Sequence, residues 1–168
     1  MSDTQDLHHS KAIEKLKELA SAEDICMFAT NLAQRPIAAR PMSTQEVDDE
    51  GNIWFLSPKS SDKNYDIQHN SEVQLFYSNK SSSEFLSVFG TATILQDREK
   101  AKEMWSPLLK TWFTKGVDDP ELTIIKVTPV DAYYWDTKSN KAVALLKIVA
   151  GAVSGKTMDD GIQGKINV

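Results

Sequence analysis

Hydrophobic residues recur at helical spacing near the start of the chain. Ile13, Leu16 and Leu19 lie three residues apart with Lys and Glu between them, which predicts a helix over residues 11–20 with one narrow apolar face. Glutamates on the same segment offset its lysines. We therefore expect this helix to pack on the rest of the fold and not on a membrane.

After this helix the pattern changes to short apolar segments separated by polar turns. Such segments, rich in β-branched and aromatic residues, are typical of strands. The polar, glycine-containing turn at residues 48–52 indicates a hairpin, and Gly90 indicates a bulge or bend in the longest strand. The predicted strands cover residues 25–31, 36–45, 53–57, 73–77, 85–95, 122–127 and 132–135.

Polar capping residues predict two helices between the strands. Ser60 or Ser61 can cap a helix over residues 62–69, because a serine hydroxyl accepts a hydrogen bond from a free N–H of the first turn. Asp97 caps a second helix, which is expected to run through Trp105. A proline two residues further on cannot continue a straight helix, so it begins a separate turn.

The chain length suits a single domain, and we treat residues 1–168 as one unit. Residues 1–10 are expected to be disordered, and residues 141–153 to form a final helix before a Gly-rich polar tail that ends at residue 168. Six or so short strands with helices between them predict a mainly β member of the α+β class. Frequent strand crossings favour antiparallel pairing in a barrel.

The charge and composition of the chain argue against nucleic-acid and membrane partners. The formal net charge is −5 and the pI is about 5.2, whereas nucleic-acid binders usually carry a basic surface, so we expect no nucleic-acid partner. The single cysteine, Cys26, lies in an apolar segment and is expected to be a buried thiol. Neither a signal peptide nor an apolar segment long enough for a membrane helix is present, so we expect a cytoplasmic protein without membrane contact.

The segment from Ser57 to Lys63 offers the clearest candidate chemistry. It follows a predicted strand and opens a predicted helix, and it contains three serines and two lysines. Hydroxyls, positive charge and the free N–H groups of a helix start are the donors that a phosphate needs. The alternative is a solvated loop with an ordinary helix cap. The glycines of a P-loop are absent, which argues against nucleotide triphosphate hydrolysis.

Arg40-Pro41-Met42-Ser43 forms a second candidate segment. An arginine on a strand can bind a phosphate or carboxylate through two parallel hydrogen bonds. A proline in a strand marks an edge or a bulge, where backbone groups are free for a ligand. The alternative is an edge strand that carries a surface arginine.

Aromatic residues form the third candidate group. They gather in the C-terminal half, where any of them can stack on a planar ring or pack in the core. The three histidines have no metal-ligand spacing with Cys or carboxylates, and the adjacent aspartate pairs are typical of turns, so we predict no metal site. The aromatic group comprises Trp105, Trp112, Phe113, Tyr133, Tyr134 and Trp135.

Taken together and in order, these segments resemble the general-stress-protein branch of the pyridoxamine 5′-phosphate oxidase-like FMN-binding split-barrel family. The likeness covers roughly residues 10–160. The motifs are Ala39-Arg40-Pro41-Met42, Ile53-Trp54-Phe55-Leu56-Ser57 with Ser61-x-Lys63, Val88-x-Gly90-Thr91-Ala92, Trp112-Phe113-x-x-Gly116-Val117-Asp118-Asp119-Pro120 and Ala132-Tyr133-Tyr134-Trp135-Asp136.

The resemblance implies a six-stranded antiparallel split β-barrel with flanking helices, which forms a homodimer with FMN at the interface. By the family pattern, the segment from Arg40 to Ser43 runs along the flavin and the ribityl chain. Ser61 and Lys63 match the phosphate-binding residues. The other cofactor contacts that the resemblance implies are Leu56 and Ser57 beside the cofactor and Trp112, Phe113 and Trp135 beside the ring, the last three from the partner chain.

Two departures from the family pattern bear on function. Asp62 occupies a place where the true oxidases carry a phosphate-binding arginine, so Arg40 and Lys63 have to supply more of the positive charge. The C-terminal arginine pattern for the vitamin substrate has no match after Trp135, which argues against pyridoxamine phosphate oxidase activity.

The resemblance leaves several functions open. The first is an FMN-dependent oxidoreductase that acts on an unknown small molecule, for which the sequence offers no convincing catalytic side chain. The second is a non-catalytic protein that stores or senses flavin during stress. A haem-binding or deazaflavin-binding relative on the same fold is the third, since a fold does not decide among such functions.

Overall fold

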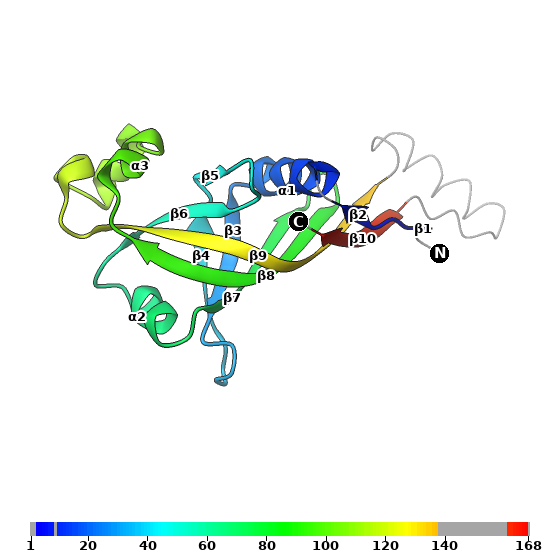
Figure 1. The fold of residues 1–168 in the computed structure, drawn as a ribbon, viewed down its shortest axis with the longest axis horizontal. Helices are drawn as coiled ribbons and strands as arrows, with labels where there is room; N and C mark the ends of the chain where they lie inside the picture. Colours follow the sequence, from blue (N-terminus) through cyan, green and yellow to red (C-terminus); the bar gives the residue numbers. More distant parts are fainter. Residues whose placement is uncertain (1–2, 9, 138–160, 168) are drawn as a thin grey trace.

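The computed structural model describes residues 3–8, 10–137 and 161–167. It is built mainly of strands, with three α-helices and two short 3₁₀ helices in the described part (Figure 1). The strands are β1 Asp3–Thr4, β2 Leu7–His8, β3 Ile25–Thr30, β4 Ala38–Ser43, β5 Glu46–Val47, β6 Ile53–Pro58, β7 Glu72–Asn79, β8 Glu84–Leu95, β9 Leu122–Thr137 and β10 Gly161–Asn167. The helices are α1 Ser10–Ala22, α2 Asp62–His69, α3 Arg98–Glu103, η1 Pro107–Thr111 and η2 Gly116–Asp118.

The strands form one sheet, in which β4, β3, β7, β8 and β9 are successive antiparallel neighbours. The long strand β9 also pairs with β6 near its start and with β10 near its end. Among the described residues no hydrogen-bonded ladder joins β4 to β6, so the sheet is open between them. The mainly β class is confirmed, but within the described residues the sheet has ten strands and not six.

Three of the additional strands lie at the ends of the described chain, and the fourth is the short strand β5, which pairs with β6. β1 and β2 pair in parallel with β10, so Asp3–Thr4 and Leu7–His8 are ordered strands where we expected disorder. Gly161–Asn167 is a strand and not a polar tail. The predicted helix at residues 141–153 lies outside the described residues. Two strands predicted at residues 122–127 and 132–135 are instead the single strand β9.

Local signals account for the other elements. Asp97 caps α3 by accepting hydrogen bonds from the backbone N–H groups of Glu99 and Lys100, although α3 ends at Glu103, short of Trp105. Gly90 lies at a register shift between β8 and β9, as predicted. A Cβ atom at this position would lie 2.5 Å from the carbonyl oxygen of Thr128, so only glycine allows the two strands to approach this closely.

Two hydrophobic clusters hold the elements together. In the larger one, α1 packs on the inner face of the sheet through residues that include Leu16 and Leu19. The rings of Phe28 and Phe55 meet edge to face there, with centroids 5.1 Å apart. Cys26 is buried in this cluster as predicted, and burial raises the pKa of its thiol to about 12. The smaller cluster packs α3 and the segment after it against β6 and β9.

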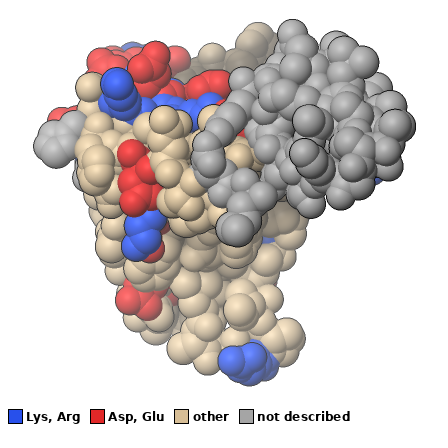
Figure 2. Space-filling view, turned by 90° about the vertical axis from the view of Figure 1, so that its right-hand side faces the viewer, with Lys and Arg blue, Asp and Glu red and all other residues tan. Residues whose placement is uncertain are grey.

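The distribution of charge on the surface and the length of the helices bear on which partners the protein can bind. On the face in Figure 2, acidic and basic side chains lie in small mixed groups, and no extended basic patch is visible. Of the helices in the described part, none is long and apolar enough to span a bilayer.

Candidate functional site

The predicted phosphate loop lies between the end of β6 and the start of α2. Ser61 occupies the N-cap position of α2, but its side chain does not accept a hydrogen bond from the free N–H groups of the first turn. Its hydroxyl lies 3.1 Å from that of Ser57 and 3.3 Å from Oδ1 of Asn64. The helix start therefore keeps backbone donors that the Ser61 side chain does not satisfy.

A buried polar network fixes this loop to the sheet. Ser57, which is fully buried, donates to Oδ1 of Asn64 at 2.7 Å. Asn64 in turn donates to the hydroxyl of Thr123 at 2.8 Å, and Thr123 donates to the carbonyl of Ser57 at 2.6 Å. The three residues join α2 to β6 and β9. Ser57 thus helps to position the loop, and its contact with a cofactor stays a prediction.

Arg40 reaches toward the same loop from β4. It pairs with Phe28 across the β3–β4 ladder. Its Nη1 donates to the Thr30 hydroxyl at 2.7 Å and, more weakly, to the Phe28 carbonyl at 3.4 Å. Its Nη2 lies 3.7 Å from Oδ2 of Asp66 on α2. The guanidinium therefore lies between β3 and α2 and is not a free surface group.

Lys63 lies close enough to Arg40 for the two positive charges to interact. Burial is the largest cause that lowers the pKa of Lys63 below its ordinary value, and repulsion by Arg40 lowers it further, while Asp62 opposes the shift. Within the described part of the chain, the Lys63 ammonium forms no hydrogen bond or ion pair. A half-buried cation without a partner, next to a second cation, is a favourable site for an anion.

Acidic residues surround these cations. Asp62 and Asp66 both lie on α2, so their two carboxylates balance the positive charges of Lys63 and Arg40. Glu121 accepts hydrogen bonds from the backbone and the hydroxyl of Ser60, at 3.1 and 2.6 Å. The Ser60 hydroxyl is therefore already engaged with Glu121.

The other residues expected at the cofactor are distributed over the fold. Pro41 and Ser43 are exposed on β4, whereas Met42 faces the core. Leu56 is buried in the smaller hydrophobic cluster. Phe113 packs in that cluster and is 2% exposed within one chain, and its contact with a flavin ring stays a prediction. The apolar environment on the outer side of β6 explains its burial.

The two tryptophans differ from Phe113 because both are accessible. Trp112 follows η1 and is 66% exposed, and Trp135 on β9 is 41% exposed. Trp135 lines an apolar hollow of about 450 Å³ together with Phe76 and Phe85. No contact in the described structure joins either indole to Arg40 or Lys63, so one chain alone does not bring the predicted ring contacts to the predicted phosphate site.

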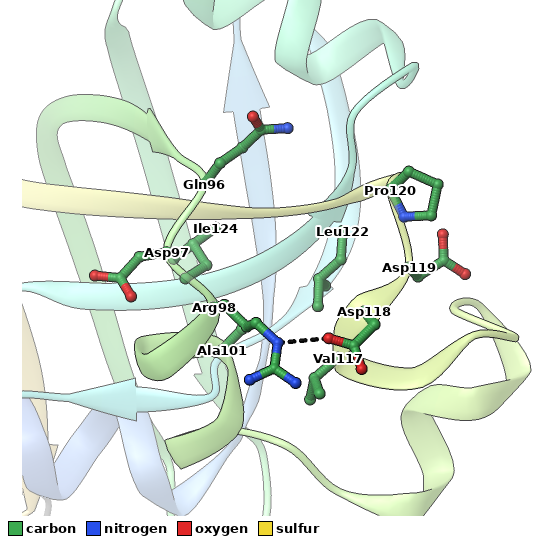
Figure 3. Close-up of a pocket in the computed structure, with 10 residues that line it drawn as sticks. All are labelled: Gln96, Asp97, Arg98, Ala101, Val117, Asp118, Asp119, Pro120, Leu122 and Ile124. Atoms are coloured by element: carbon green, nitrogen blue, oxygen red, sulfur yellow. Dashed lines mark hydrogen bonds and ion pairs between the residues drawn. The ribbon is translucent and has the colours of Figure 1, made fainter.

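Two further hollows lie on the surface near α2 and α3. A groove of about 490 Å³ runs between α2 and the end of β8 and reaches Asn64 and Thr123. The hollow in Figure 3, of about 270 Å³, lies beside α3 and η2, and the side chains of Arg98 and Asp118 point toward each other at its edge. This ion pair is solvent-exposed, so it contributes little binding specificity.

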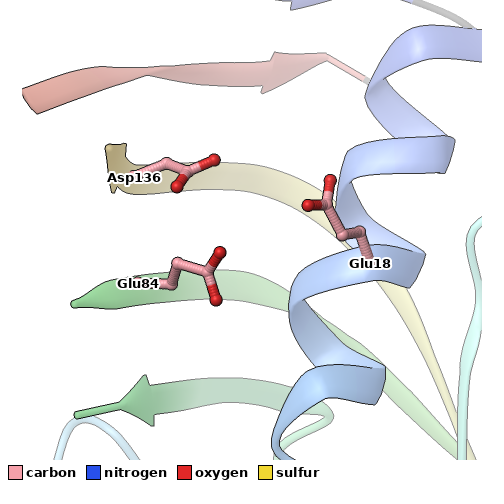
Figure 4. A group of neighbouring side chains, drawn as sticks. All are labelled: Glu18, Glu84 and Asp136. Atoms are coloured by element: carbon pink, nitrogen blue, oxygen red, sulfur yellow. The ribbon is translucent and has the colours of Figure 1, made fainter. Parts of the chain in front are cut away.

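Three carboxylates approach one another at the other end of the sheet. Glu18, Glu84 and Asp136 come from α1, β8 and β9 (Figure 4). Lys15 forms ion pairs with both Glu18 and Asp136, so the positive charge that this group needs is already supplied by the chain. We assign no metal to it.

The sequence matches the family described as "Pyridoxamine 5′-phosphate oxidase like" over residues 11–159. The chain belongs to this family. Its fold is similar to that of solved relatives. The structure of a candidate general stress protein 26 from Jannaschia sp. CCS1 superposes with a TM-score of 0.74 at 24% identity, covering 94% of this chain and 96% of that one.

Two other relatives extend the comparison. The general stress FMN/FAD binding protein from Xanthomonas citri is similar in structure, with a TM-score of 0.65 and 25% identity over 77% of this chain and 90% of that one. Protein bli-3 of Neurospora crassa is 26% identical over 113 residues, which cover 62% of this chain. The chain spans 54% of the length of this curated relative.

Sequence reasoning missed the residues that support the site. Thr30 and Asp66 hold Arg40, and Asn64 and Thr123 hold the loop, yet none of the four stood out as a candidate. Asn64 and Asp66 lie inside a predicted helix, where polar residues usually face solvent. Asn64 lies three residues before Ile67 and shares its buried helix face, but one polar residue at helical spacing is too weak a signal to single out.

Proposed function

We propose that this protein binds FMN and that the FMN phosphate lies between Arg40, Ser61 and Lys63. The observation that carries the proposal is the position of Arg40, which reaches from β4 to Asp66 on α2, the helix whose first turn carries Lys63. The donors fit a phosphate, because the set combines a guanidinium, an ammonium, a hydroxyl and the backbone N–H groups of a helix start. The relative from Xanthomonas citri is described as an FMN/FAD binding protein, which supports the choice of ligand.

The proposal includes a homodimer in which each flavin contacts both chains. An apolar patch on the outer face of the sheet supports this assembly. Met27 and Phe76 are cross-strand neighbours on β3 and β7, and Phe85 and Trp135 are neighbours on β8 and β9. All four are more than 40% exposed, and exposed aromatic clusters of this kind mark protein interfaces.

A bound flavin would supply electron transfer, and the protein would position the cofactor and exclude competing reactions. We therefore propose an FMN-dependent oxidoreductase on a small molecule, located in the cytoplasm, where a lone thiol such as Cys26 stays reduced. Reduction of bound flavin by NADPH, followed over time by its absorbance, tests this step. Flavin that binds but is not reduced would support a protein that stores or senses flavin.

Isothermal titration with FMN and with riboflavin, which lacks the phosphate, tests the ligand and its orientation together. FMN should bind more tightly than riboflavin, because only FMN reaches the cations at α2. Equal affinities would contradict the placement of the phosphate. A protein that binds neither flavin would contradict the proposed function.

A further inference from the structure

The guanidinium of Arg40 donates its hydrogen bonds through Nη1 alone among the described residues. Nη1 donates to Thr30 and to the carbonyl of Phe28, both on β3. In the described part of the chain, neither Nε nor Nη2 of Arg40 donates a hydrogen bond, and Nη2 forms a long ion pair with Oδ2 of Asp66 at 3.7 Å. The Nε–Nη2 edge is the one that binds two oxygens of a phosphate in parallel.

Thr30 is held in a defined orientation by Asp66. The Thr30 side chain is fully buried, and its single hydroxyl proton is donated to Oδ2 of Asp66 at 2.6 Å. With its proton directed at the carboxylate, the hydroxyl oxygen can only accept from Arg40. Asp66 on α2 therefore fixes the hydroxyl on β3, and the hydroxyl fixes the guanidinium on β4.

Orientation matters here because overall charge attracts little. Arg40 and Lys63 are balanced by Asp62 and Asp66, so an anion gains little from the net charge of these four groups. Affinity for a phosphate then depends on directed hydrogen bonds, whose strength falls steeply with poor geometry. A guanidinium that rotates freely would lose much of this directed interaction.

We infer that Thr30 and Asp66 are positioning residues, which hold the Nε–Nη2 edge of Arg40 toward the phosphate of the ligand. The inference rests on the proposed function, since it takes FMN as the ligand. By this inference Asp66 favours phosphate binding, although its negative charge by itself would repel the phosphate. Removal of Asp66 is expected to weaken phosphate binding, although removal of an acid near an anion would otherwise strengthen it.

The test is a double-mutant cycle read by FMN and riboflavin affinity. Thr30→Val keeps the side-chain shape and removes the hydroxyl, and it should weaken FMN about tenfold while leaving riboflavin unchanged. Thr30→Ser should restore FMN affinity. In an Arg40→Met background Thr30→Val should have no further effect, because the guanidinium that it orients is gone. Parallel loss of both flavins, or an undiminished loss in that background, would overturn the inference.

Substitution of two aspartates on α2 gives a second test, which does not depend on a variant of the buried Thr30. The quantity compared is whether each substitution raises or lowers FMN affinity. Asp66→Ala should weaken FMN, whereas Asp62→Ala, a matched change on the same helix, should strengthen it. If both variants strengthen FMN, Asp66 acts only as a repelling charge and the inference is wrong.

A wild-type protein that binds no flavin would contradict the proposed function without yet testing the role of Thr30 and Asp66. If the wild-type protein binds no flavin, the same variants are compared with inorganic phosphate as the probe, read as a shift in melting temperature. A shift in the wild type that is lost in Thr30→Val and kept in Thr30→Ser would support the positioning role without FMN. Equal shifts in all variants, or no shift in the wild type, would overturn it.

Discussion

At the scale of single residues, the candidate site depends on cations that were visible in the sequence and on polar supports that were not. Arg40 and Lys63 stood out because a phosphate needs their charge. Thr30 and Asp66 did not, because their role comes from the way α2 packs beside β3, which no local pattern encodes. Charged groups that contact a ligand are thus easier to predict than the neutral or acidic groups that orient them.

Substitution of Lys63 tests the site directly. Lys63→Met should weaken FMN by about 1.5–3 kcal/mol, the range for a hydrogen bond to a charged group, and should leave riboflavin affinity unchanged. Lys59→Met is the matched control, because Lys59 is an exposed lysine of the same loop. Titration calorimetry on both variants decides the matter. Unchanged FMN affinity in Lys63→Met would place the phosphate elsewhere.

The pH dependence of binding follows from the lowered pKa of Lys63. Only the protonated ammonium attracts phosphate, so FMN affinity should fall as pH rises through this pKa, at a lower pH than the ordinary lysine value of 10.5. The stability of the ligand-free protein should change in the opposite direction, because the buried charge penalises the folded state until it is neutralised. FMN titrations from neutral to alkaline pH should show the fall in the wild type and lose it in Lys63→Met.

At the scale of elements, predictions were best where a local rule decides the structure. Asp97 predicted the start of α3, and Gly90 predicted the bulge between β8 and β9. Both features depend mainly on the identity of one residue. The continuous strand β9 and the terminal strand β10 could not be predicted in this way. β9 crosses the polar and proline-containing segment near residue 129 because its ladder with β8 continues beyond the bulge.

The bulge supplies a stability test. Gly90→Ala places a Cβ atom 2.5 Å from the Thr128 carbonyl, so the strands must separate. The free energy of unfolding should fall by about 1–3 kcal/mol, the usual cost of overpacking. Thr91→Ala, at the neighbouring exposed position, should change it by less than about 0.5 kcal/mol. Urea denaturation of both variants measures the difference, and equal stabilities would show that the two strands can separate there at no cost.

At the scale of the whole molecule, the distribution of aromatic residues is the feature that one chain does not explain. Trp112 and Trp135 are exposed, and neither contacts the proposed phosphate site in its own chain. A second copy would both cover the outer patch of Met27, Phe76, Phe85 and Trp135 and bring such rings to the flavin. The resemblance suggested this assembly, whereas a sequence pattern by itself does not distinguish an exposed aromatic residue from a core one.

A charge introduced into the patch tests the assembly. Phe76→Glu should convert the dimer to a monomer in sedimentation velocity, because a buried unpaired carboxylate is costly at an interface. FMN affinity should fall in the same variant if the site is shared between chains. Gln68→Glu, which adds the same charge at an exposed position on α2, should remain a dimer. A wild-type protein that is monomeric at all concentrations would contradict the shared site.

The central claim, that this chain holds FMN, is tested most directly by the visible absorption spectrum of the purified protein after FMN has been added and the excess removed. The account predicts retained bands near ~370 and ~450 nm, the signature of an oxidised flavin that stays bound. A protein that remains colourless after this treatment would contradict the account and limit the similarity to the fold.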